Sequence, residues 1–144
     1  MDVTESCSDE SAQTLTLPRL GGQVESTGYA RQYTGKACRL TSTTLELGRP
    51  RTFDAHGYAD GDGGDATPFL PRSLFSTEFV TAAPYEFLAF VSNEPGTIDV
   101  NGVHVELEGA GDVYTARVAG GEAGERISSS VPVWAVLEDR QSNQ

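Results

Sequence analysis

The pattern of apolar and polar positions is clearest in the second half of the chain. An apolar run of strand length occupies residues Tyr85–Val91, and alternating segments then lie on either side of Asn101-Gly102. That dipeptide favours positive φ at both central positions of a two-residue hairpin loop. The loop fixes three facing pairs, two apolar and one polar: Val100 with Val103, Ile98 with Val105, and Asp99 with His104. One side of this ribbon is therefore apolar and the other polar, which predicts a sheet packed on one face only.

Further strand-like segments recur along the chain, with turn signals about every 8–12 residues. They occupy residues 14–17, 29–47, 74–81, 85–91, 97–100, 103–108, 113–118 and 127–137. No apolar repeat of the helical period runs for three turns. The pattern predicts an all-β fold, a single antiparallel β-sandwich or jelly-roll-like domain with long loops. Trp134 is expected in its core, and the nearby Pro132 implies an edge strand or a bulge.

The remaining segments predict how the domain is bounded. Residues 1–13 are polar and are expected to form a flexible N-terminal arm. Residues 14–138 form the β-sandwich domain, and residues 139–144 are a polar C-terminal tail. Within the domain, residues 48–68 are irregular, acidic and rich in Gly, which predicts a long loop. Because connections of that length are uncommon in compact domains, this loop is where a site is expected.

Charge separates this chain from an average soluble domain. Its 144 residues carry 21 acidic and 10 basic side chains, a net charge of −11, and the only lysine is Lys36. Self-repulsion of that size is costly in dilute buffer but is screened at about 1 M salt, where the Debye length is ~3 Å. The Asp and Glu excess and the near absence of Lys resemble the proteins of salt-loving archaea. An ordinary acidic mesophilic protein is the alternative.

The same composition bears on partners and location. An acidic surface repels polyanions, and the best local basic group, Arg31, Tyr33, Lys36 and Arg39, is better explained by local ion pairs, so nucleic acid is not expected as a partner. No apolar run is long enough to cross a membrane as a helix. The first residues lack the basic and apolar regions of a signal peptide, so synthesis in the cytoplasm without that export route is expected.

Cys7 and Cys38 are the only cysteines. They lie far apart in the sequence and do not form the C-x-x-C pair of a zinc or redox motif. Two interpretations stay open, a disulfide that ties down the N-terminal segment and a pair of free thiols in a reducing cell.

The acidic residues Asp60, Asp62 and Asp65 resemble part of an EF-hand calcium loop, where closely spaced carboxylates gather oxygens around a hard cation. Three positions depart from that pattern: Gly64 is fifth, Asp65 takes the place of the Gly at the sixth, and Pro71 replaces the Glu at the twelfth. The three aspartates are the candidate ligands for Ca²⁺ or Mg²⁺, and no other cofactor is expected. The alternative is a hydrated acidic loop.

Two histidines raise the question of catalysis. His56 with Asp54 and the three loop aspartates could form a mixed nitrogen and oxygen metal site of the cupin-like kind, but such sites use two or more histidines. A polar loop histidine is the alternative. Asp99 beside His104 could orient an imidazole, yet Ser128–Ser130 lacks the sequence around a nucleophile elbow. We interpret that pair as a surface contact and expect no catalytic residues.

These observations favour a non-enzymatic structural or interaction subunit of a larger assembly. Small β domains with extended arms resemble head-decoration or tail-accessory proteins of tailed viruses, which implies a homo-oligomeric virion protein of a halophilic archaeal virus. The alternative is a carbohydrate-binding or cell-surface β-sandwich module that uses Phe53, Tyr58 and the acidic loop, with calcium dependence. A small metal-dependent enzyme centred on the His56 loop is the third class.

Overall fold

The computed structural model describes residues 2–9, 12–16, 19–20, 23–24, 36–46, 49–59 and 70–138. These residues form antiparallel strands and one 3₁₀ turn, η1 (Arg72–Leu74), and they contain no α-helix. The predicted all-β, sandwich-like antiparallel fold is confirmed.

The strands form two main sheets and one short hairpin. The first sheet, in spatial order, is β2 (Ala12–Thr16), β1 (Asp2–Cys7), β5 (Lys36–Glu46), β6 (Arg49–Ala59) and β7 (Leu70–Pro71). The second is β11 (Val103–Glu106), β10 (Thr97–Val100), β14 (Arg126–Glu138), β9 (Tyr85–Ser92), β13 (Val113–Gly121) and β12 (Glu108–Ala110), with β8 (Ser76–Val80) also paired to β14. The short hairpin is β3 (Arg19–Leu20) with β4 (Gln23–Val24).

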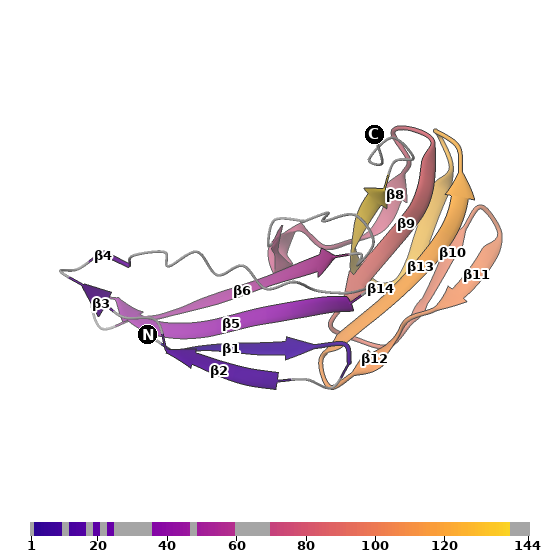
Figure 1. Ribbon diagram of the computed structural model, residues 1–144. Coiled ribbons are helices and arrows are strands. Elements are labelled where there is room, and N and C mark those ends of the chain that lie inside the picture. Colours follow the sequence, from indigo (N-terminus) through magenta and orange to yellow (C-terminus); the bar gives the residue numbers. More distant parts are fainter. Residues whose placement is uncertain are drawn as a thin grey trace, which may run out of the picture.

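The two sheets differ in shape (Figure 1). Strands β8 to β14 curve into a compact unit, here called the body, whereas β1, β2, β5 and β6 project from it as a long, thin sheet, here called the extension. The short strands β3 and β4 lie at the far end of the extension.

Strand β9 is apolar from Phe87 to Val91 because both of its faces are covered there. Leu88 and Phe90 point into a core enclosed by the body itself. Ala89 and Val91, on the opposite face, pack in a second cluster with Ala37 and Tyr58 of the extension and with Trp134. Burying alternate side chains on both faces produces the continuous apolar run seen in the sequence, and the core position predicted for Trp134 is confirmed.

The hairpin predicted from Asn101-Gly102 is confirmed in register. Val100 pairs with Val103, Ile98 with Val105 and Asp99 with His104, while Asn101 and Gly102 adopt φ angles of 51° and 88°. Its apolar side is covered unevenly, because Ile98 and Val100 are buried whereas Val103 is 56% exposed on the outer strand β11.

Strand β14 connects the two halves of the body and bends between them. Its first part pairs with β10 and its last part with β9, and the register with β8 shifts between Ser128 and Val133. At this bend the Ser92 hydroxyl donates to the Pro132 carbonyl oxygen at 2.9 Å, and the Thr97 amide donates to Ser130 Oγ at 2.9 Å. Side chains therefore replace interrupted ladder bonds. Pro132 predicted an edge strand or a bulge, and the structure has a register shift at this place.

The N-terminal segment differs from the predicted flexible arm. Residues Asp2–Cys7 form β1, an inner strand of the first sheet between β2 and β5. Cys7 lies directly opposite Cys38 of β5, and the two are joined in a disulfide. The flexible-arm prediction was wrong for these residues, because strand pairing and a covalent bond offset the ordering entropy that a polar segment cannot offset alone.

The long loop predicted for residues 48–68 was wrong in its first half. Arg49–Ala59 form β6, which pairs with β5 along its whole length. The sequence conceals this strand because alternation there is between small and large side chains, with the buried Ala55 and Gly57 on one face and the buried His56 and Tyr58 on the other. Residues 60–69 lie outside the described residues.

The burial of β9 generates a stability prediction. We expect Phe90→Ala to lower the free energy of unfolding by about 3–5 kcal/mol, because Phe90 is fully buried and its removal leaves a cavity. Phe53→Ala is the matched control, since Phe53 is 51% exposed and should cost less than about 1 kcal/mol. Urea unfolding at about 2 M NaCl measures both, and equal losses would contradict the assigned core.

The disulfide generates a second prediction. The bridge closes a sequence separation of 31 residues, so Cys7→Ala with Cys38→Ala should lower the free energy of unfolding by about 3–4 kcal/mol in the loop-entropy model. Mass spectrometry of the denatured wild-type chain should show a mass lower by two hydrogens, which returns on reduction. A chain that carries two free thiols as purified under non-reducing conditions would contradict the structure.

Candidate functional site

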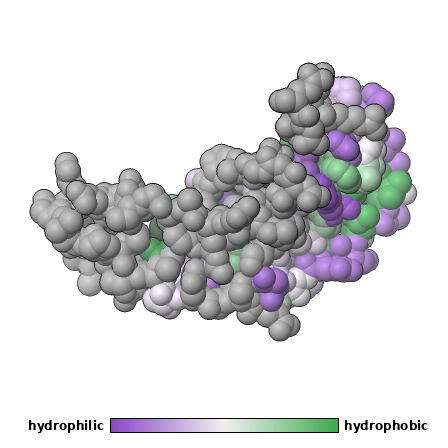
Figure 2. All heavy atoms as spheres, in the orientation of Figure 1, coloured by the Kyte–Doolittle hydropathy of each residue, from purple (hydrophilic) through white to green (hydrophobic). Residues whose placement is uncertain are grey.

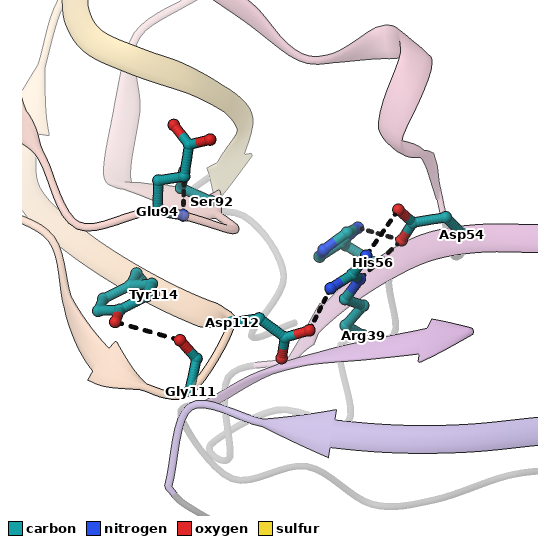
Figure 3. A network of polar contacts seen from close by, with 8 residues as sticks. All are labelled: Arg39, Asp54, His56, Ser92, Glu94, Gly111, Asp112 and Tyr114. Carbon is teal, nitrogen blue, oxygen red and sulfur yellow. Dashed lines mark hydrogen bonds and ion pairs between the residues drawn. The ribbon is translucent and has the colours of Figure 1, made fainter.

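The extension meets the body at a polar cluster centred on Arg39 of β5 (Figure 3). Arg39 Nε and Nη2 donate to the two carboxylate oxygens of Asp54 on β6, each at 2.9 Å. Arg39 Nη1 donates to Asp112, in the turn between β12 and β13 of the body. One guanidinium therefore links two strands of the extension to a turn of the body, which fits the local ion pairing expected for Arg39.

The charges of this cluster stabilise one another. The hydrogen bond from Arg39 lowers the pKa of Asp54 below its ordinary value, although partial burial opposes the shift. The hydrogen bond to Asp54 in turn raises the pKa of Arg39, and Asp112 adds to the effect. The cluster is thus charged at neutral pH and joins the two parts of the molecule electrostatically.

His56 lies beside this cluster and is fully buried. Its ring packs against Phe75 at a centroid distance of 4.8 Å. Its Nδ1 is 3.9 Å from Asp54 Oδ1, too far for a hydrogen bond. Among the residues that the structure describes, neither ring nitrogen of His56 has a hydrogen-bond partner. The alternative interpretation of His56, a polar histidine in a loop, was therefore wrong.

The surroundings of His56 keep it neutral. Burial lowers the pKa of His56 from 6.5 to about 4, and the positive charges of Arg39 and Arg72 act in the same direction. The carboxylates of Asp54 and Asp112 oppose the shift but do not reverse it. At pH 7 the imidazole is uncharged, so it contributes packing to the junction rather than an ion pair.

The candidate metal ligands are placed unevenly by the structure. Asp60, Asp62 and Asp65 lie outside the described residues, and the Ca²⁺ or Mg²⁺ loop stays a prediction. His56 and Asp54, proposed for a mixed site, do lie close together, but both Asp54 oxygens already accept hydrogen bonds from Arg39.

A different group of potential ligands brings Glu5, Cys7 and Cys38 within 4.8 Å of one another. Its two sulfurs are joined in the disulfide, so neither is a thiolate that could bind a metal. The group therefore does not supply a metal site in this oxidised form.

The pair Asp99 and His104 lies on the surface, with His104 Nδ1 3.3 Å from Asp99 Oδ2 and its side chain 71% exposed. Ser128 faces Asp99 from the other side, so the three residues form a row across β11, β10 and β14. A nucleophilic triad needs the imidazole between the hydroxyl and the carboxylate. Here the carboxylate is central, and two strand spacings of about 4.8 Å separate His104 from Ser128. The row does not have the geometry of a triad.

The remaining candidate catalytic residues accept hydrogen bonds from backbone amides. Ser129 Oγ accepts a hydrogen bond from the Val131 amide at 3.3 Å, and Ser130 Oγ accepts one from Thr97. Asp99 Oδ1 accepts from the Gly102 amide at 2.9 Å and so supports the hairpin turn. These contacts explain why Ser and Asp occur where the chain bends.

Sequence reasoning missed the junction itself. Arg39, Asp54 and Asp112 lie in different parts of the chain, and no short motif connects them. One available signal was the period-two alternation of Asp54, His56 and Tyr58, which places all three on one face of a strand. That face is the one that meets the body.

Comparison with known proteins did not add a relative. A scan of family models, a search of curated proteins and a search of solved structures each found no match to this chain. Among the described residues, no helix has the length and apolar character needed to cross a membrane.

The buried His56 generates a pH prediction. Because its pKa is lowered in the folded chain, the unfolded chain takes up a proton first as the pH falls. The folded state keeps the full contribution of this group above about pH 6.5 and loses about 3 kcal/mol as the pH falls to about 4. In His56→Leu this loss should disappear, because leucine is neutral at every pH.

Urea unfolding at a series of pH values measures this slope. His104→Ala removes the exposed histidine and serves as the control, and it should retain the wild-type pH dependence. Identical slopes for wild type and His56→Leu would contradict the assignment of a buried, uncharged imidazole.

Proposed function

We propose that this chain is a non-enzymatic structural subunit of a larger assembly, and that the assembly is the virion of a virus infecting a salt-loving archaeon. A head-decoration or tail-accessory position fits its size. The observation that carries the proposal is the extension, a sheet that leaves the body and offers surface to a neighbour (Figure 1).

The extension is costly for an isolated chain. A thin sheet buries less apolar surface for each ordered residue than a compact layer does. Thr43, Thr52 and Phe53, in the part of β5 and β6 away from the body, are exposed. Assembly supplies the missing burial, because a neighbouring subunit can cover such a surface.

The composition supports the surroundings proposed for this assembly. A net charge of −11 on 144 residues disfavours close packing of copies in dilute buffer. At the salt concentration of a halophilic cell that repulsion acts only over a few ångströms. This chain therefore assembles in concentrated salt, where the repulsion between copies is screened.

The alternative of a carbohydrate-binding or cell-surface module depended on Phe53, Tyr58 and the acidic loop. Tyr58 is only 4% exposed and belongs to the cluster that joins the two sheets, so it is not available to a glycan. Phe53 is 51% exposed, and it lies on an extended sheet rather than in a groove described by the structure. We therefore favour assembly over glycan binding.

The proposal predicts a defined oligomer. Light scattering after size exclusion at about 2 M NaCl should give the mass of an oligomer, a whole-number multiple of the 15.3 kDa chain that is larger than one chain. Peptide mass spectrometry of purified halophilic virus particles should detect the chain. A protein that stays monomeric over the accessible concentration range and is absent from particles would contradict the proposal.

A further inference from the structure

A buried carboxylate lies beside the disulfide of the extension. Cys7 of β1 faces Cys38 of β5 directly. Glu5, two residues before Cys7, points to the same side of the sheet because side chains alternate along a strand. The exposed fractions are 0% for Glu5, 2% for Cys7 and 0% for Cys38. Charged groups are found in such places where they are paired or coordinate a metal. The carboxylate and the two sulfurs therefore form one buried group of potential metal ligands.

This group lies on the face of the extension opposite to the body. The residues on either side of Cys38 point the other way, because Ala37 belongs to the cluster that joins the two sheets and Arg39 binds Asp112 of the body. On its own face Cys38 is next to Gly57 of β6, which adds no side chain there. A metal ion bound to this group therefore does not compete with the ion pairs of the junction. Figure 2 shows the extension and the body in one view, with hydrophilic side chains over much of the described surface of the body.

The distances among the three ligand atoms fit a tetrahedral zinc ion. Zinc binds thiolate sulfur at about 2.3 Å and carboxylate oxygen at about 2.0–2.2 Å, which places neighbouring ligand atoms of a tetrahedron roughly 3.4–3.8 Å apart. Glu5 Oε1 is 3.7 Å from Cys7 Sγ, and the three ligand atoms all lie within 4.8 Å of one another. Breaking the bond between the two sulfurs is therefore the chemical change that makes this group a ligand set.

The ligand types select the metal. Two thiolates are soft ligands, which favour zinc over the hard cations Ca²⁺ and Mg²⁺ that take oxygen ligands. The third ligand is a carboxylate, so the three groups together carry three negative charges. A divalent cation neutralises two of them in a place that excludes water.

We propose that the reduced chain binds one Zn²⁺ through Cys7, Cys38 and Glu5. A thiol reductant, itself oxidised to a disulfide, supplies the two electrons and two protons that convert the bond between Cys7 and Cys38 into two thiols. Zinc displaces both thiol protons into solvent and binds the two thiolates and the carboxylate, with water as its fourth ligand. Oxidation of the two thiolates to the disulfide releases the ion. The metal and the disulfide are thus alternative links between β1 and β5, and zinc binding is independent of assembly into a particle.

Cobalt(II) tests the site, because it occupies tetrahedral zinc sites and shows charge-transfer absorption only where thiolates bind it. The full-length chain is unfolded and reduced with a phosphine, which adds no competing thiolate, then refolded at about 2 M NaCl and titrated with Co²⁺. The charge-transfer absorption should saturate at one ion per chain and disappear when Zn²⁺ displaces the cobalt. The oxidised chain should not give this absorption. A reduced chain that lacks it would overturn the proposal.

A matched pair of variants tests the carboxylate. Glu5→Gln should weaken Co²⁺ binding roughly tenfold or more, since the loss of a group that only supports a ligand already costs about 10–100-fold. Glu78→Gln removes the same charge at an exposed position of the body and should bind as wild type does. Circular dichroism of the oxidised forms checks that both variants fold. Equal affinities of Glu5→Gln and wild type would exclude Glu5 as a ligand and overturn the site.

X-ray absorption at the zinc edge of the reduced wild-type chain needs no variant. Two sulfur and two oxygen ligands are expected. Four sulfur ligands would mean that two chains share one ion, and oxygen ligands alone would place the ion elsewhere, so either result overturns the proposal. A chain that binds zinc through two sulfurs and two oxygens but never associates supports this site and contradicts the assembly proposal.

Discussion

Strand β9 must bury apolar side chains on both of its faces, and the rest of the structure depends on that requirement. Its Leu88 and Phe90 are covered by the curved sheet of the body. Its Ala89 and Val91 need a second cover, which the near ends of β5 and β6 provide. The curved sheet of the body therefore covers one face of β9, and the extension covers the other.

Apolar contact outweighs ion pairing at the junction of the two sheets. Fully burying one side chain such as Val91 contributes about 1.5–3 kcal/mol. The contact of Arg39 with Asp112 is partly solvated, since the Asp112 side chain is 45% exposed, and such a pair contributes about 1 kcal/mol or less. The cluster of Arg39, Asp54 and Asp112 therefore orients the extension, while packing around Val91 and Trp134 holds it.

Much of the body could be predicted from the sequence because its signals are local. The Asn101-Gly102 turn set the hairpin register, Pro132 marked the place where the register of β14 shifts, and the apolar run of β9 marked the core. The extension was mostly hidden, because β1 and β6 are polar strands that lack an apolar alternation, and because β1 also pairs with the distant strand β5. Their formation depends on the Cys7 to Cys38 bond and on the β5 ladder, which no periodicity reveals.

The sequence indicated which polar residues belong to the candidate site but not where in the fold they lie. Asp54 and His56 attracted attention as polar groups, but their burial depends on Phe75 and on the turn that carries Asp112. The sequence also favoured a free N-terminal arm as the part that reaches a neighbour. In the structure these residues instead belong to a paired, disulfide-linked sheet.

Hydrogen exchange followed by mass spectrometry, applied to wild type and Trp134→Ala in high salt, tests the two-sided burial of β9 most directly. Trp134 belongs to the cluster that joins the sheets and not to the core inside the body. We expect its removal to speed exchange in peptides covering Ala37 and Tyr58, while peptides covering Ile98 and Ile127 keep their protection. Uniformly faster exchange through both regions, or no change beside Ala37 and Tyr58, would contradict the account.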